Sequence, residues 1–378
     1  MSQTTVDTPS SARQSRHYRI AALPGEGIGP EVVEACLTIL QAIAQAENFT
    51  LTIQRAHIGS QAQQQFGTPL PTETLSVCEA SDSILFGSVT KGGLLELRRH
   101  FDLFINLRPV KPIPSLASAS PLKAERLQNV DLLFVRELTS GIYFGPSGRQ
   151  KNEQGKFGFH TMHYADSDIR RIARVALKYA QNRQQHLVVA HKENALHHLP
   201  WSQLVQSEAK NFSTVTVEPM LVDNLAMQLI LRPKDFDVIL AGNLFGDILS
   251  DLGGAITGSI GLLGSASLNA DGFGLYEAVH GTAPDIAGKG IANPLGTLAS
   301  CILMLRQWKE HSAAQTLESI QTKLLKQGYR TYDLKENYSV NNRTTANSST
   351  SAHRLVTTSE LVNLFLDEIE KIKPLTQK

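Results

Sequence analysis

Short apolar runs alternate with longer amphipathic segments along most of the chain. Such runs, bounded by charged residues or glycines, are typical of strands buried on both faces of a parallel sheet. They occur at 18–23, 83–87, 131–138, 186–190 and 237–242. Helical periodicity is found at 32–46, 92–101, 169–180, 298–308 and 359–372. The alternation predicts an α/β fold with a largely parallel sheet.

The segment 243–251 follows one of these predicted strands and changes to helical spacing. Asp247 and Asp251 are four residues apart, so a helix places both carboxylates on one face, with about 5–6 Å between their Cβ atoms. Oxygen ligands at such spacing suit Mg²⁺ or Mn²⁺. The pair also comes at the carboxyl end of a strand, where open α/β sheets bind ligands. The alternative is two solvated acids favoured by the helix dipole.

Three arginines occur close to predicted strand or helix ends, at Arg98, Arg108 and Arg136. Guanidinium groups bind carboxylates through two parallel hydrogen bonds. Because Leu94 and Leu95 precede Arg98 by about one helical turn, this group suits an acid with an apolar tail. Solvated arginines over core leucines are the alternative.

Further polar side chains follow other predicted strands. Tyr143 stands between two glycines in a turn, and is either an accessible hydroxyl or a core aromatic. Lys192 follows the strand at 186–190, where it is either a surface charge or a base whose pKa is lowered by desolvation. Asp223 is a third acid at a probable strand end.

Several segments read as loops. The glycine turn at 24–31 has the spacing G-x-G-x-G, not that of the dinucleotide fingerprint, and we expect a tight turn at the mouth of a cleft. The polar segment 148–158 is expected to form a protruding arm, and 257–268 an apolar hinge. The glycine-rich segment 274–294 predicts a long ligand-binding loop, and 336–353 a polar loop.

Composition excludes several classes of protein. The chain has 378 residues, 42% hydrophobic and 19% charged, with a formal charge of +1, which gives no global attraction to nucleic acid or anionic membranes. The three cysteines form no disulfide or zinc pattern, and no run of about 18 apolar residues could span a membrane. We expect a cytoplasmic protein with no nucleic-acid or membrane partner. The polar residues 1–16 predict a disordered tail, or alternatively an organellar presequence.

Seven motifs, in order along the chain, together resemble the metal-dependent, NAD(P)-linked β-decarboxylating dehydrogenases of 2-hydroxy acids. The motifs are LPGEGIGPE, GGLLELR with NLRP, VRELTSGIYFG, HKEN, VDNLAMQL, NLFGDILSD and YEAVHGTAPDIAGKGIANP. The resemblance covers the chain from about Tyr18 to its end. It implies two α/β domains that share a continuous sheet, a fold distinct from the Rossmann fold. Residues 1–108 with 259–378 would form the first domain and 109–258 the second, with the active site in the cleft between them.

The resemblance also implies roles for individual residues. Asp247 and Asp251, with Asp223 from a second subunit, would hold Mg²⁺ or Mn²⁺ against the substrate, and Asp223 would also contact the substrate. The three arginines would bind the carboxylates, and Leu94 and Leu95 would contact the substituent at C3. Lys192, also from the second subunit, would take part in removing the C2 hydroxyl proton, and Tyr143 would protonate the enolate. A homodimer with shared active sites follows.

The cofactor would be NAD. The implied contact residues are Ile28, Asn194, Glu277, His280, Gly281, Ala283, Asp285, Ile286 and Asn293. Asp285 favours NAD because a carboxylate accepts hydrogen bonds from ribose hydroxyls and repels a 2′-phosphate. The expected reaction is oxidative decarboxylation of a 3-substituted malate, with 3-isopropylmalate as substrate and a place in leucine biosynthesis.

The chain departs from the family pattern at a few positions. The segment between Val89 and Gly92 is short, Lys91 replaces a glutamate, and His191 replaces an aspartate. None of these changes removes a proposed catalytic group, but the short segment leaves the preferred C3 substituent open. Alkyl- or arylmalate, tartrate, D-malate, homoisocitrate and isocitrate are alternative substrates. A non-catalytic regulatory subunit is a further alternative, although such subunits usually lose some of these acids, the tyrosine or the lysine.

Overall fold

A ten-stranded sheet runs through the computed structural model, which describes residues 16–335 and 353–372. The strand order is β2-β1-β3-β12-β11-β4-β5-β10-β8-β9. The strands are β1 (Arg16–Gly25), β2 (Phe49–Arg55), β3 (Ser83–Ser88), β4 (Ile105–Val110), β5 (Leu132–Glu137), β8 (His186–His191), β9 (Thr216–Leu221), β10 (Val238–Ala241), β11 (Gly264–Leu268) and β12 (Gly274–Ala278).

The two ends of the sheet are parallel and its centre is antiparallel. Strands β2, β1, β3 and β12 are parallel to one another, and so are β5, β10, β8 and β9. The pairs β12–β11, β11–β4 and β4–β5 are antiparallel. The predicted α/β class and shared continuous sheet are confirmed, and this strand order is not that of a Rossmann fold.

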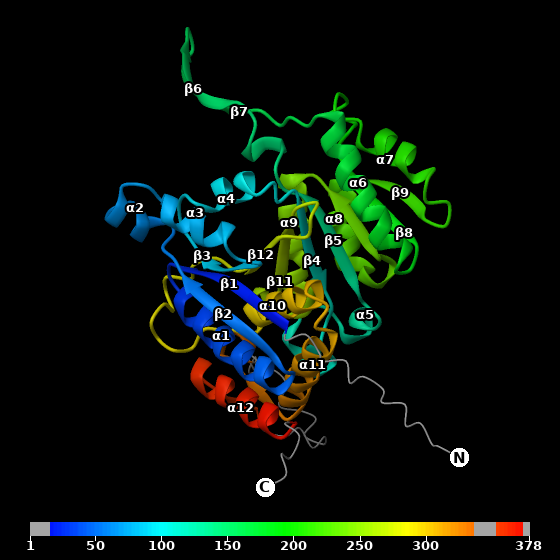
Figure 1. Cartoon of the computed structure of the whole chain (residues 1–378). Helices are drawn as coiled ribbons and strands as arrows, with labels where there is room; N and C mark the ends of the chain where they lie inside the picture. The colour runs from blue at the N-terminus through cyan, green and yellow to red at the C-terminus, as the bar shows by residue number, and fades with distance from the viewer. Residues whose placement is uncertain (1–15, 336–352, 373–378) are drawn as a thin grey trace, which may run out of the picture.

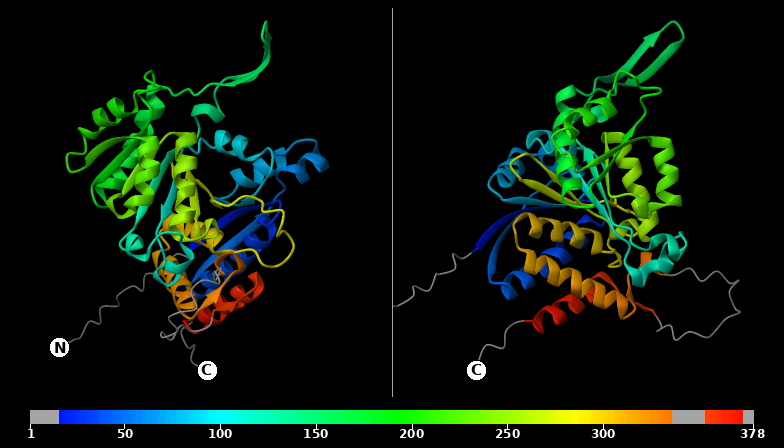
Figure 2. Two further views of the ribbon diagram at one scale, coloured as in Figure 1. Left: turned by 180° about the vertical axis from the view of Figure 1, so that it is seen from behind. Right: turned by 90° about the vertical axis from the view of Figure 1, so that its right-hand side faces the viewer.

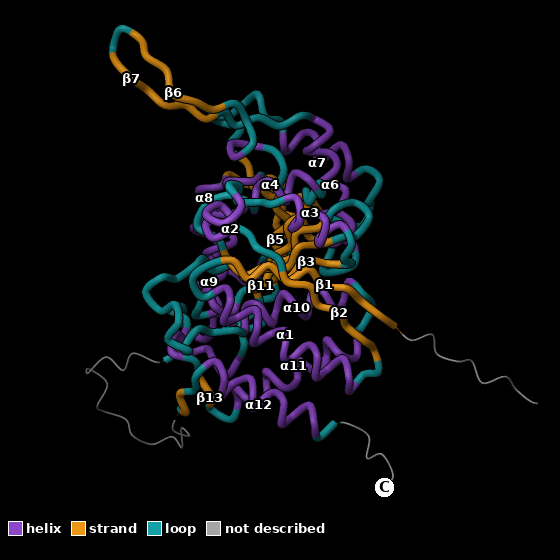
Figure 3. The backbone as a smooth tube through the Cα atoms, turned by 60° about the vertical axis from the view of Figure 1, so that its left-hand side comes forward, coloured by secondary structure: helices purple, strands orange, loops and turns teal. Residues whose placement is uncertain are grey.

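One face of the sheet is covered along its whole length by helices. Helices α1 (Gly29–Ala46), α6 (Asp166–Gln181), α7 (Trp201–Ala209) and α10 (Leu295–Gln307) pack directly on the strands, and α11 (His311–Lys326) and α12 (Thr358–Glu370) pack on α1 and α10 as an outer layer. These helices and the strand residues beneath them form the largest hydrophobic core. Figure 3 shows α1, α10, α11 and α12 packed together below the strands.

The opposite face is covered by two separate groups of helices. The first consists of α2 (Ser60–Phe66), α3 (Thr72–Glu79) and α4 (Leu94–His100), and packs on β1, β3 and β12. The second consists of α5 (Ala124–Leu127), α8 (Val222–Leu231) and α9 (Asn243–Thr257), and packs on β5, β8 and β10. The central strands carry polar side chains on this face, between the two groups.

Local sequence signals explain where several helices begin and end. Pro30 and Glu31 lie in the first turn of α1, where a missing N–H and a negative charge are both favourable. Helix α9 ends at Gly258, whose φ of 97° suits glycine. Thr357 and Glu360 form a capping box at the start of α12.

The predicted arm is a hairpin that extends away from the rest of the molecule (Figure 1 and Figure 2). Its strands β6 (Ser147–Asn152) and β7 (Gly155–His160) are antiparallel, so the expectation of a loop at 148–158 was wrong in detail. A lone two-stranded hairpin is marginally stable in water.

Two other segments differ from the sequence-based expectations. The hinge expected at 257–268 contains a short 3₁₀ helix, η4 (Ile260–Leu262), and the buried strand β11. The first five residues of the expected loop at 274–294 form β12. Glycine, serine and alanine have low strand propensity, and tertiary pairing holds them in the sheet here. An added Cβ at Gly264 would lie 2.5 Å from the backbone nitrogen of Ser300, so α10 can only pack this closely on glycine.

The remaining described elements are short. They are η1 (Pro114–Ala119), η2 (Gly141–Tyr143), η3 (Pro233–Asp235), η5 (Tyr332–Leu334), β13 (Tyr329–Arg330) and β14 (Arg354–Leu355). The tail expected at 1–16 and the loop expected at 336–353 lie almost wholly outside the described residues. Within residues 16–335 and 353–372, no helix is long and apolar enough to cross a membrane.

Candidate active site

The register of the central strands turns three charged side chains toward the same face of the sheet. Side chains two residues apart on a strand share a face. Arg108 lies on the same face as Val110, Arg136 on the same face as Phe134, and Glu277 on the same face as Leu275. The apolar residue of each pair packs under one of the two helix groups. These charged groups lie between α4 and α9, where they line a cleft.

The cleft has a volume of about 370 Å³. The predicted residues that line it are Leu94, Leu95, Arg98, Arg108, Arg136, Tyr143, Asp247, Glu277, His280 and Gly281. They come from α4 on one side, from the η2 turn and α9 on the other, and from the strands between. A volume of this size suits a small molecule.

Arg98 is held on one wall of the cleft by Glu277. The Nη2 atom of Arg98 donates a hydrogen bond of 2.8 Å to Oε1 of Glu277, and both side chains are buried. The Nε atom of Arg98 has no hydrogen-bond partner among the described residues. A buried guanidinium with free hydrogen-bonding capacity is suited to an anionic ligand.

Arg108 and Arg136 converge on the two predicted metal-binding acids of α9. The Nη1 atom of Arg136 donates to Oδ1 of Asp247 at 2.6 Å, and Nη2 of Arg108 lies 3.2 Å from the same oxygen. The Nη1 atom of Arg108 donates to Oδ1 of Asp251 at 3.1 Å. The helical spacing of the two acids is thus confirmed, and they lie beside two of the predicted carboxylate-binding arginines.

Two neutral residues of α9 orient these arginines, and the sequence analysis did not select them. Asn243 accepts a hydrogen bond of 2.7 Å from Nη2 of Arg136, and Ser250 accepts one of 2.7 Å from Nη1 of Arg108. Both side chains are buried. Their positions on the helix face of Asp247 and Asp251 were the only available signal.

A glycine lets α9 approach the sheet at this point. An added Cβ at Gly246 would lie 2.7 Å from Cγ of Arg136. Any side chain at residue 246 would therefore displace the arginine or the helix.

Tyr143 reaches the cleft from η2, which follows β5. Its hydroxyl donates to Oδ2 of Asp247 at 3.2 Å. Partial burial and the charge of Asp247 raise the pKa of Tyr143 above its usual value. The hydroxyl therefore keeps its proton at neutral pH.

Burial also shifts the pKa of two other groups in the cleft. Burial and the charge of Arg108 lower the pKa of Arg136 to about 9, so this guanidinium is still charged at neutral pH. Partial burial, reinforced by Asp247 and partly offset by Arg108, raises the pKa of Asp251. Two carboxylates so close to each other favour a bound cation.

Lys192, Asn194 and Asp223 lie outside the cleft. The Nζ atom of Lys192 forms an ion pair of 2.9 Å with Oδ1 of Asp223, which lowers the pKa of Asp223. Asn194 is exposed in the loop after β8. Among the described residues, no three His, Cys, Asp or Glu side chains gather in one chain as a metal site. This arrangement agrees with the expectation that Lys192 and Asp223 serve a second subunit, which stays a prediction.

Part of the predicted cofactor site forms a small apolar cluster beside the glycine turn. Ile28 is buried, and Ala283 and Ile286 pack against its cluster. The backbone N–H of Ile28 donates to the carbonyl oxygen of Thr282 at 2.9 Å. Gly27 has a φ of 62°, and its added Cβ would lie 2.0 Å from the same oxygen, so the close approach of turn and loop needs glycine here.

The polar members of the predicted cofactor site lie along the same loop. His280 is largely buried, which lowers its pKa, and its Nε2 has no partner among the described residues. Asp285 is exposed, and Gly281 has open space beside it. Asn293 is buried and donates to Oδ2 of Asp333 at 2.9 Å.

A family model described as "Isocitrate/isopropylmalate dehydrogenase" matches residues 19–361 of the chain. The chain belongs to the isocitrate/isopropylmalate dehydrogenase family. It is 48% identical to the 3-isopropylmalate dehydrogenase of Halalkalibacterium halodurans over 84% of this chain and 92% of that protein. It is 40% identical to the 3-isopropylmalate dehydrogenase of Aquifex aeolicus over 95% and 99% of the two chains.

Solved structures of related dehydrogenases share the fold. The isocitrate dehydrogenase of Methylococcus capsulatus aligns with a TM-score of 0.80 and 29% identity, over 93% of this chain and 99% of that one. A β-decarboxylating dehydrogenase of Thermococcus kodakarensis aligns with a TM-score of 0.73 and 29% identity, over 94% and 96% of the chains. The resemblance drawn from the seven motifs is confirmed, and this chain is a dehydrogenase of that family.

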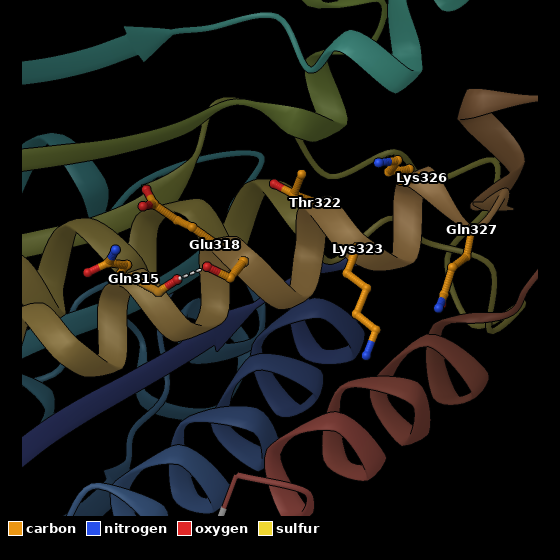
Figure 4. A pocket seen from close by; sticks show the side chains of 7 residues that line it. Gln315, Glu318, Thr322, Lys323, Lys326 and Gln327 are labelled. Carbon is orange, nitrogen blue, oxygen red and sulfur yellow. Dashed lines mark hydrogen bonds between the residues drawn. The ribbon is translucent and has the colours of Figure 1, made fainter.

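A larger hollow lies elsewhere on the dehydrogenase, over the outer surface of α11 (Figure 4). It is open and is lined by Gln315, Glu318, Ser319, Thr322, Lys323, Lys326 and Gln327. Its lysines are long surface side chains, and Lys323 already pairs with Glu368. The cleft between α4 and α9, where buried charges converge, is therefore the candidate active site.

Proposed function

We propose that this dehydrogenase catalyses the oxidative decarboxylation of a 3-substituted malate, with 3-isopropylmalate as its substrate. The main supporting observation is that Arg98, Arg108 and Arg136 converge near Asp247 and Asp251, beside an apolar wall formed by Leu94 and Leu95. The products would be 4-methyl-2-oxopentanoate, CO₂ and NADH. This reaction belongs to leucine biosynthesis.

Two features of the cleft support a dicarboxylate with an apolar tail. The three arginines can bind carboxylates because each keeps hydrogen-bonding capacity: the buried Nε atoms of Arg98, Arg108 and Arg136 have no hydrogen-bond partner among the described residues. Leu94 and Leu95 line the cleft one helical turn before Arg98. Each CH₂ of the substrate buried there contributes about 0.8 kcal/mol, so the isopropyl group favours its own binding by roughly 2 kcal/mol.

The residues present suit a divalent cation. Asp247 and Asp251 supply carboxylate oxygens, and partial burial together with the repulsion of Asp247 raises the pKa of Asp251 against the attraction of Arg108. A cation between them would lower this repulsion. Asp223 of the partner subunit would complete the ligand set.

The loop after β12 suits NAD. The apolar cluster around Ile28 can pack against an aromatic ring, and His280 offers an unpaired ring nitrogen. Exposed Asp285 would accept hydrogen bonds from the adenosine ribose and repel a 2′-phosphate, which favours NAD over NADP. The predicted contacts of Glu277, Gly281, Ala283, Ile286 and Asn293 belong to the same proposal.

The proton transfers would use two residues of opposite subunits. Asp247 and Asp251 would hold the divalent cation, which would supply Lewis-acid chemistry, and the loop after β12 would hold NAD⁺ as the hydride acceptor. Lys192 of the partner subunit would accept the proton from the C2 hydroxyl. Tyr143, whose raised pKa keeps it protonated, would deliver a proton to C3 after CO₂ leaves. One proton is removed and one returned, so the step balances.

We also propose a homodimer in which residues 1–108 with 259–378 form one domain and 109–258 the other. Exposed apolar side chains at Met227, Leu231 and Ile248 on α8 and α9 support an interface there. The extended arm supports further contact between subunits.

The test is NADH formation with purified protein, Mg²⁺ or Mn²⁺, and a panel of 2-hydroxy diacids. We expect kcat/KM for 3-isopropylmalate to exceed the values for malate, tartrate and isocitrate. Benzylmalate tests whether the short segment before Gly92 leaves room for a larger group. A clear preference for isocitrate or for unsubstituted malate would contradict the proposed substrate, and no activity at all would favour a regulatory subunit.

A further inference from the structure

The turn that carries Tyr143 is held by a buried carboxylate on the side of the sheet away from the cleft. Glu137, fully buried, accepts hydrogen bonds of 3.0 Å from the backbone N–H groups of Thr139 and Ser140. Asn243 donates from Nδ2 to the carbonyl oxygens of Leu138 and Ser140, at 3.1 and 2.9 Å. The backbone just before η2 is therefore fixed from both sides.

Arg171, on α6, extends to the same turn. Its Nη2 donates to Oγ1 of Thr139 at 2.8 Å, and Nη2 lies 4.0 Å from Oε1 of Glu137. Its guanidinium group lies over the ring of Phe104, 4.2 Å from the centroid. Its Nη1 donates to both carboxylate oxygens of Asp102, at 3.1 and 3.0 Å, and its Nε lies 3.9 Å from Oδ1 of Asp168.

Asp102 is the link to α4. It lies two residues past the end of that helix. Its φ of 45° is in the left-handed region, which is uncommon for residues other than glycine. The backbone N–H of Leu103 donates to the carbonyl oxygen of Arg98 at 2.9 Å, so the position of Asp102 is coupled to that of Arg98. A second contact joins the same elements, since the guanidinium of Arg99 lies 5.1 Å from the ring centroid of Phe144.

We propose that Arg171 is a positioning residue, which fixes the turn of Tyr143 relative to helix α4 with its Arg98 and leucines. The inference rests on the proposed function for the role of Tyr143. Asp102 is 60% and Arg171 31% exposed, and pairs of this exposure contribute little to stability. The contact instead fixes the position of the Tyr143 turn relative to α4, on the other side of the cleft.

The adjacent residue provides a matched control. Arg170 is 34% exposed on the same helix and donates to Oε1 of Glu208 at 2.9 Å, on the side of α7. Arg174 also binds Glu208, so Arg170→Gln leaves no unpaired acid. The test compares Arg171→Gln with Arg170→Gln, with Asp102→Asn as an independent way to break the link.

In steady-state kinetics, we expect Arg171→Gln to lower kcat about tenfold to a hundredfold, because small displacements of a reacting group have effects of this size. KM for NAD should change less than about twofold, and Arg170→Gln should behave as wild type. The effect of Arg171→Gln should be smaller when Tyr143→Phe is already present, because both changes act on the same step. Arg171→Lys should restore activity only in part, since an ammonium lacks the planar fork.

Amide hydrogen exchange in the substrate-free protein gives a readout that does not depend on the reaction. Peptides covering 138–146 should exchange faster than in wild type in Arg171→Gln and Asp102→Asn. In Arg170→Gln their exchange rate should equal that of wild type. If wild-type protein oxidises none of the diacids, the proposed function fails, and exchange still tests the link itself. Equal kcat and equal exchange in Arg171→Gln and Arg170→Gln would overturn the role of Arg171.

Discussion

Each arginine of the cleft contacts an acid of the same chain, and this pairing leaves one charge poorly compensated. Asp247 contacts both Arg108 and Arg136, whereas Asp251 shares Arg108 with Ser250 and is half exposed. Its raised pKa means that the folded protein holds the ionised form less favourably than the unfolded chain does. The ionised side chain of Asp251 therefore suits a bound cation but lowers the stability of the folded protein without one.

Asp251→Asn should therefore raise the Tm of metal-free protein at neutral pH. It should also lower turnover by about a hundredfold or more, as expected for loss of a metal ligand. Because the pKa of Asp251 is raised, the penalty is present above its folded pKa and vanishes below the unfolded value. The gain in Tm should accordingly disappear as the pH falls below about the ordinary value of 3.8.

Thermal unfolding with and without Mg²⁺ or Mn²⁺, or with EDTA, checks this prediction. The metal should stabilise wild type and not Asp251→Asn, since a ligand stabilises only the state that binds it. Asp271→Asn, in an exposed turn, is the control. Full activity in excess EDTA would contradict the metal assignment.

Leu95 lines the cleft but is 40% exposed, so a change there alters the substrate-binding surface more than the core. Leu95→Arg should raise the ratio of kcat/KM for isocitrate over 3-isopropylmalate by about tenfold or more, because the new cation can pair with a third carboxylate and the apolar contact is lost. Leu355→Arg, 39% exposed and distant, is the control. An unchanged ratio would mean that Leu95 does not contact the C3 substituent.

At the scale of elements, one face of α9 holds two of the three arginines of the cleft. Asn243, Asp247, Ser250 and Asp251 recur at helical spacing and contact the two arginines of β4 and β5. The helix must therefore lie close to the sheet, and Gly246 permits this approach.

Gly246→Ala should lower the stability by about 1–3 kcal/mol through overpacking against Arg136, although alanine is the better helix former. Activity should fall with it, since the arginine must move. Gly254→Ala on the same helix, where the added Cβ comes no nearer than 3.3 Å to another atom, should be milder. Denaturant unfolding and kcat/KM distinguish the two variants, and equal behaviour would argue against close packing as the cause.

At the scale of the whole molecule, the proposed catalytic groups are divided between two places. Tyr143 lines the cleft, whereas Lys192 pairs with Asp223 outside it. A single chain therefore does not assemble the full proposed set, and the exposed apolar residues of α8 and α9 suggest how a second copy would bring the missing groups.

Mixing inactive Lys192→Ala and Tyr143→Phe chains should restore part of the activity. In a heterodimer, one of the two shared sites keeps both groups, so at most about half the wild-type activity is expected per heterodimer. Differently tagged subunits allow the heterodimer to be isolated after refolding. If purified heterodimer is inactive while refolded wild type is active, the sites are not shared in this way.

The sequence alone predicted the α/β class, five of the ten strands of the sheet (β1, β3, β5, β8 and β10), the placement of Asp247 and Asp251 on one helix face, and the family. These features depend on local periodicity and on short motifs, both of which are legible along the chain. The residue pattern and the family resemblance together selected side chains that the cleft brings together: the pattern selected Arg98, Arg108, Arg136 and Tyr143, and the resemblance added Glu277, His280 and Gly281.

Only the tertiary structure revealed β11 and the roles of Asn243, Ser250 and Gly246. Small residues such as those of β11 have no strand pattern of their own, and their conformation is set by strands paired from distant parts of the chain. Likewise, contacts such as Arg171 with Asp102 join positions 69 residues apart. Local sequence preferences cannot predict such contacts, because the contacts form only when distant parts of the chain pack together in the folded protein.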